Sequence, residues 1–152
     1  MRNHRSFISL IAAVSLTTLF WHGPAGADTL GQYQPPVLRK AELALQHGLP
    51  DHALALLEGR AAELRQWRAQ AQGSDLMCRA YFDKGDYASA ERACDAAVLA
   101  GGESAWRYVY HRGVMRLLLG RVDEGVSDLR RAASMGPPTG AFAANLAIAT
   151  SF

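Results

Sequence analysis

The stretch GDYASAERACDAAVLAGG, residues 85–102, has a close counterpart in GRVDEGVSDLRRAASMG, residues 120–136. Each begins with a glycine, carries a small residue five positions later (Ala90 and Gly125), and contains no proline. A third copy with the same register begins at Gly48. The three glycines are 37 and 35 residues apart, close to the period of roughly 34 of a two-helix repeat. The sequence therefore predicts a row of helical hairpins.

The same register extends to both sides of the three glycines. Seven residues before them stand Ala41, Cys78 and Gly113, and nine residues after them stand Leu57, Cys94 and Leu129. Small residues let antiparallel helices approach to the short end of the usual axis separation of roughly 8–10 Å. One hairpin cannot bury its apolar face alone, but a stack of hairpins can. β-Branched residues never alternate over the length of a strand, so the expected fold class is all-α.

The repeat resembles the tetratricopeptide repeat (TPR) family. The second copy carries the family pattern at Met77-Cys78, Tyr81, Ala90, Cys94 and Ala97. The third copy matches at Gly113, Leu129, Ala132 and Pro137, but has Arg112 and Arg116 where the family has leucine and an aromatic residue. The first copy keeps Ala41, Ala53 and Leu57, with Arg60 and Arg65 in place of alanine and proline. The resemblance covers about residues 36–152 and implies an α-solenoid, a right-handed superhelix of about three antiparallel hairpins.

The expected hairpins and the final helix have the following bounds: about 37–66, 71–102 and 105–136, with a capping helix at about 139–150. The last helix covers the apolar face of the final hairpin, as solenoids require. Apolar residues keep helical spacing over residues 51–72 and are interrupted only by Gly59. That segment is therefore one long helix or two helices broken near residues 62–68. Trp67 within it is interpreted as a packing residue.

The N-terminus, residues 1–27, has the pattern of a secretory signal. Its parts are Arg2 and Arg5, an apolar run at residues 7–21, and the small-x-small triplet Ala25-Gly26-Ala27. The run of 15 residues is short for a membrane span of roughly 20, so we expect cleavage rather than a retained anchor. Residues 28–36 are expected to form an irregular lead-in, because Pro35 and Pro36 disfavour helix before them. The expected location is periplasmic or secreted, from a bacterium, with no membrane insertion after cleavage.

Charge and motifs exclude several classes of function. Without the two arginines of the signal, 14 basic residues face 14 acidic ones, so no basic surface for nucleic acid is predicted. The sequence contains no nucleophile elbow, zinc-protease motif, C-x-x-C or phosphate loop, and we expect no catalytic residues, no cofactor and no enzyme activity. In the turn HGLPDH, His47 and His52 flank Asp51, which is interpreted as a helix N-cap rather than a metal ligand.

The two cysteines lie eight residues to either side of Asp86 in the predicted turn. An antiparallel hairpin therefore places Cys78 and Cys94 at the same height. A disulfide requires α-carbons within roughly 7 Å, and an exported protein is in a permissive compartment. We expect Cys78 and Cys94 to form a disulfide; the alternative is a pair of small apolar residues in the hairpin core.

The family resemblance implies that the first helix of each hairpin lines a concave face. The residues predicted to bind a partner there are Asp75, Arg79, Phe82, Arg107, Tyr110, His111 and Asn145. Of the lysine and asparagine clamp by which some family members hold a carboxylate, only Asn145 is matched. The predicted function is a protein interaction module that holds a peptide or protein segment. The alternative is a structural or assembly subunit of an envelope complex that uses its convex face or its ends.

Overall fold

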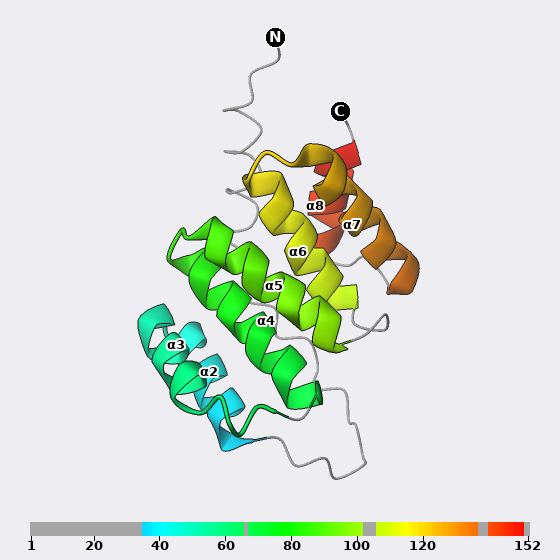
Figure 1. Ribbon diagram of the computed structural model, residues 1–152. Helices are drawn as coiled ribbons and strands as arrows, with labels where there is room; N and C mark the ends of the chain where they lie inside the picture. The colour runs from blue at the N-terminus through cyan, green and yellow to red at the C-terminus, as the bar shows by residue number, and fades with distance from the viewer. Residues whose placement is uncertain (1–34, 66, 102–105, 137–139, 151–152) are drawn as a thin grey trace.

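The computed structural model describes residues 35–65, 67–101, 106–136 and 140–150, and these residues form helices with no strand among them (Figure 1). The helices are α2 (Pro36–Gln46), α3 (Pro50–Gly59), α4 (Trp67–Asp83), α5 (Tyr87–Gly101), α6 (Trp106–Leu118), α7 (Val122–Met135) and α8 (Ala141–Thr150). The predicted signal at 1–27 and the lead-in up to residue 34 lie outside the described residues. The protein is an all-α solenoid.

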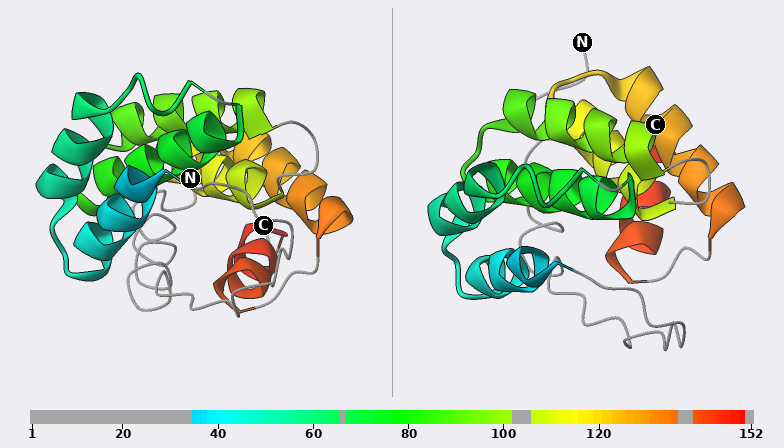
Figure 2. Two further views of the ribbon diagram at one scale, coloured as in Figure 1. Left: turned by 90° about the horizontal axis from the view of Figure 1, so that it is seen from below. Right: turned by 60° about the horizontal axis from the view of Figure 1, so that its bottom comes forward.

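Successive helices pack as three hairpins, α2 with α3, α4 with α5 and α6 with α7. Contacts of α3 with α4 and of α5 with α6 join each hairpin to the next, and α8 packs against α7. The row is curved, so that α2 and α8 project to the same side of α4 and α6 (Figure 2, left). This side, formed by α2, α4, α6 and α8, is called the concave face below.

The turn inside each hairpin repeats one hydrogen-bonding pattern. In the second hairpin the Gly85 N–H donates to Phe82 O at 2.8 Å, and the Asp86 N–H donates to Tyr81 O at 3.0 Å. The third hairpin repeats both bonds 35 positions later, where Gly120 again leads the turn. Gly85 and Gly120 have φ angles of +76° and +79°, in the left-handed region that glycine adopts without a Cβ penalty. The glycine periodicity in the sequence is thus the periodicity of this helix-ending turn.

Residues 51–72 form two helices, which settles the alternative that the sequence left open. Helix α3 ends at Gly59, a turn follows, and α4 begins at Trp67, four residues before the predicted start at residue 71. Leu64 in the turn is buried and lies against Gly73, where an added Cβ would be 2.9 Å from Leu64 Cδ1. The turn is therefore held by insertion of Leu64 into the core. The side chain of Trp67 lies outside the described residues.

The buried side chains form two clusters along the row. One lies between the first hairpin and α4, and the other extends from α4 to α8. Tyr81 packs against both clusters, and its hydroxyl donates to Glu58 Oε1 at 3.4 Å. The core is therefore nearly continuous along the solenoid, as stacked repeats require.

The cysteines and glycines of the repeat lie where the two helices of a hairpin approach most closely. Cys78 and Cys94 form a disulfide between α4 and α5, with their α-carbons 5.2 Å apart. In the third hairpin Gly113 and Leu129 take the two positions, and a Cβ added to Gly113 would be 3.2 Å from Leu129 Cδ2. One hairpin thus closes this contact with a covalent bond, and the next closes it by placing a leucine over a glycine.

Candidate functional site

Helices α4, α6 and α8 carry the seven residues that the sequence assigns to a partner site. Asp75, Arg79 and Phe82 follow one another on α4 at helical spacing, Arg107, Tyr110 and His111 lie on α6, and Asn145 lies on α8. Their exposure divides them into two groups. Phe82, Tyr110 and Asn145 are buried, with 9%, 7% and 1% of their surface exposed. Arg107 is exposed, while Asp75, Arg79 and His111 are partly exposed. Arg79, Arg107 and His111 can therefore present polar atoms to a partner.

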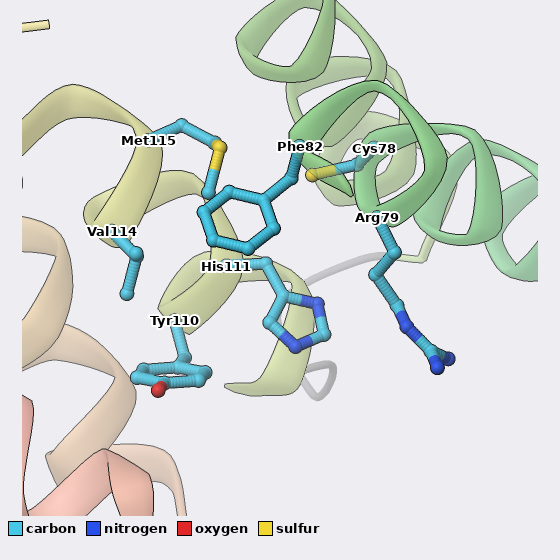
Figure 3. A pocket seen from close by; sticks show the side chains of 7 residues that line it. All are labelled: Cys78, Arg79, Phe82, Tyr110, His111, Val114 and Met115. Carbon is cyan, nitrogen blue, oxygen red and sulfur yellow. The ribbon is translucent and has the colours of Figure 1, made fainter. Parts of the chain in front are cut away.

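A small cavity lies between α4 and α6. Its volume is about 20 Å³, and it is lined by Cys78, Arg79, Phe82, Tyr110, His111, Val114 and Met115. Such a volume accommodates about one water-sized group. Figure 3 shows the Arg79 guanidinium and the His111 imidazole extending to the same side, beside the rings and the methionine that form the apolar wall. Four of the predicted partner residues therefore surround one cavity.

Asp75 and His111 form a hydrogen-bonded pair across two hairpins. The distance between His111 Nδ1 and Asp75 Oδ1 is 2.5 Å, and both side chains are mostly buried. Burial alone would raise the pKa of the Asp75 carboxyl, but His111, Arg79 and Arg107 together lower that pKa below its ordinary value. Asp75 is therefore a carboxylate at neutral pH, and it fixes the orientation of the imidazole.

The two arginines of the concave face have weak partners among the described residues. Arg79 Nη1 is 4.0 Å from Glu42 Oε1 on α2, a separation at the limit of an ion pair. The Arg107 guanidinium lies 5.7 Å from the ring centre of Trp106, a distance at which the cation and the ring attract each other. Burial raises the pKa of the neighbouring Tyr108 to about 12, to which the charge of Asp75 adds. Tyr108 is therefore neutral at physiological pH.

Helix α8 is seated on α6 by aromatic and amide contacts. Phe142 stacks on Trp106, with ring centres 5.6 Å apart, and packs against Tyr110, with ring centres 4.7 Å apart. The Asn145 side-chain amide donates to the Tyr110 hydroxyl at 2.9 Å. Burial raises the pKa of Tyr110 to about 12, although the bond from Asn145 opposes the rise. Tyr110 and Asn145 thus hold the cap helix in this structure, a pairing that sequence spacing does not reveal.

Comparison with solved structures finds proteins of similar fold. The first TPR domain of human RPAP3, an NMR structure, superposes with a TM-score of 0.68 at 20% identity, covering 76% of this chain and 87% of that one. The fold is that of a TPR domain. No family model matches the chain, and no curated protein sequence matches it either.

The two arginines that depart from the TPR pattern form a charged network, which sequence reasoning missed. Arg112 donates two hydrogen bonds to the buried Asp128 of α7, both at 2.8 Å, and Arg116 donates a third at the same distance. Arg112 also donates a hydrogen bond to Asp95 Oδ1 of α5 at 3.2 Å, and Arg116 donates one to Glu91 Oε1 of α5 at 3.3 Å. The network therefore ties the second TPR hairpin to the third. One sequence feature could have indicated this network: Asp128 lies one residue before the repeat position Leu129, near the face on which α7 meets α6.

In the part of the chain that the structure describes, no three His, Cys, Asp or Glu side chains gather as metal ligands would. No described helix combines the length and apolarity needed to cross a membrane. The two cysteines are oxidised to a disulfide, a state compatible with an oxidising compartment.

Proposed function

We propose that the protein is a non-enzymatic interaction module that holds a peptide or protein segment on its concave face, in the cell envelope after export and removal of residues 1–27. The observation that carries the proposal is the cavity between α4 and α6, whose polar lining residues are Arg79 and His111. Asp75 is hydrogen-bonded to His111, and Arg107 is exposed on the same helix, α6. Peptide sites combine a largely apolar wall with a few convergent polar groups in this way.

Two further observations support the proposal. The TPR fold stacks hairpins into an extended concave surface, and repeat proteins use such surfaces for binding. The disulfide between Cys78 and Cys94 is compatible with the oxidising compartment that the N-terminal signal pattern predicts.

The experiment is affinity capture from envelope extract with wild-type protein and two charge-reversal variants. Arg79→Glu changes the concave face, and Arg130→Glu makes the same change on the exposed surface of α7. Tyr110 is left unchanged because it seats α8. We expect Arg79→Glu to lose the partner and Arg130→Glu to retain it, with helical circular dichroism unchanged in both. A partner retained by Arg79→Glu would favour the assembly subunit that binds through another face.

A further inference from the structure

The carboxylate of Asp75 determines which nitrogen of His111 carries the proton. An ionised carboxylate has acceptor atoms only, so at 2.5 Å from it His111 Nδ1 must be the donor. The low pKa of Asp75 keeps the carboxyl ionised at neutral pH. In a neutral imidazole with hydrogen on Nδ1, the other nitrogen, Nε2, has a free lone pair. In its neutral form, His111 therefore offers a hydrogen-bond acceptor with a fixed direction.

Nε2 of His111 has no hydrogen-bond partner among the residues that the structure describes. His111 and Arg79 both line the cavity, and their polar ends extend to the same side of it (Figure 3). Arg79 supplies donors, because a guanidinium has no acceptor atom. The cavity mouth thus offers one acceptor and one set of donors beside an apolar space for about one water-sized group.

These three features match one peptide unit of an extended chain, which has an N–H donor, a carbonyl acceptor and a side chain. We propose that His111 Nε2 accepts the main-chain N–H of a partner segment, that Arg79 donates to a main-chain carbonyl, and that the residue between them has a side chain as small as that of alanine or serine. The inference rests on the function proposed above and specifies its ligand. Asp75 acts as a positioning residue, because it touches His111 and not the partner.

Protonation of His111 removes the acceptor, because both ring nitrogens are then donors. The charged and titratable groups that face the pair are Arg79 on α4, with Glu42 of α2 beyond it, and Arg107 and Tyr108 on α6. Tyr108 is neutral at physiological pH, because burial raises its pKa to about 12. Binding through Nε2 therefore requires the neutral imidazole of His111.

The first test needs no ligand. Long-range ¹H–¹⁵N NMR spectra at neutral pH report which imidazole nitrogen carries hydrogen. We expect the Nδ1–H form for His111 in the wild type, with His47 and His52, both exposed, as internal references. In Asp75→Asn, whose amide no longer requires a donor at Nδ1, the Nε2–H share of His111 should rise. Asp83→Asn makes the same charge change on an exposed residue of the same helix and should leave the spectrum unchanged. An Nε2–H form in the wild type would overturn the inference.

The second test uses a displayed library of random heptapeptides selected on the wild-type protein. We expect the selected peptides to share a glycine, alanine or serine at one position. N-methylation of a single amide should weaken each peptide about three- to tenfold, as expected for one hydrogen bond. His111→Phe and Asp75→Asn should produce a similar loss, whereas Asp83→Asn should not.

The outcomes separate the two proposals. If peptides bind and Arg107→Glu weakens them, but His111→Phe and Asp75→Asn do not, the inference is wrong and the concave site stands. If the wild type selects no peptide, both proposals are wrong. Selected peptides that require a large side chain at the fixed position also contradict the inference.

Discussion

The buried carboxylate of Asp128 offers the sharpest test of how the arginines of α6 are held against α7. Its side chain is 7% exposed, and it accepts three hydrogen bonds at 2.8 Å from two arginines. Asp128→Ala removes all three bonds and leaves Arg112 and Arg116, 14% and 17% exposed, without their main partner. Removing one member of a buried charged pair typically destabilises a protein by about 3–5 kcal/mol.

The structure places the expected loss at the lower end of that range. Both arginines keep a second carboxylate, Asp95 for Arg112 and Glu91 for Arg116, so neither charge becomes unpaired. We therefore expect Asp128→Ala to lower the free energy of unfolding by about 3 kcal/mol. The assay is urea denaturation followed by circular dichroism at neutral pH.

Asp123→Ala is the matched control, because Asp123 is an exposed carboxylate in the first turn of the same helix. It interacts with the helix dipole, and we expect a loss of about 0.3–1 kcal/mol. If Asp128→Ala lowered the free energy of unfolding no more than Asp123→Ala, the network would not contribute to stability beyond an exposed charge.

Four further predictions concern other parts of the molecule. Cys94→Ser should lower the free energy of unfolding by about 3 kcal/mol, the chain-entropy value for a loop of this length, and free Cys78 for alkylation; labelling of both cysteines in untreated exported protein would contradict the disulfide. Gly125→Val should destabilise by about 1–3 kcal/mol or more, because a Cβ there would be 2.6 Å from Leu117 Cγ and 2.9 Å from Gly113 O; a melting temperature equal to that of wild type would refute the close approach. Because the folded-state pKa of Asp75 is lowered from 3.8, its stabilisation is present above that pH and is lost as the pH falls further, so the stability difference between wild type and Asp75→Asn should shrink in acid titrations followed by fluorescence; a constant difference would refute it. The intact mass of periplasmic protein should correspond to an N-terminus at Asp28, and a full-length, membrane-bound chain would exclude cleavage.

The sequence by itself determined the repeat and the local structure that follows from it. Gly85 and Gly120 end helices because the left-handed conformation is intrinsic to glycine at that turn. Small residues at a constant distance from those turns fixed the face on which paired helices meet. For the same reason the positions of Cys78 and Cys94 brought their α-carbons within disulfide range. These features depend on spacing along one hairpin, which helical geometry converts directly into position.

The tertiary structure decided how deeply individual side chains are buried and which residues they contact. Helical spacing placed Phe82 and Tyr110 on the face predicted to bind a partner, but it could not tell whether a neighbouring helix covers that face. Phe142 of α8 covers Tyr110, and Asn145 is buried in the same contact.

The ionic and polar pairings have the same origin. His111 meets Asp75 36 residues away, and Arg112 meets Asp95 17 residues away. Each pair forms because two helices are packed at a particular distance and rotation. Periodicity within one helix defines a direction for each side chain, whereas the contact that this side chain makes depends on how the hairpins stack.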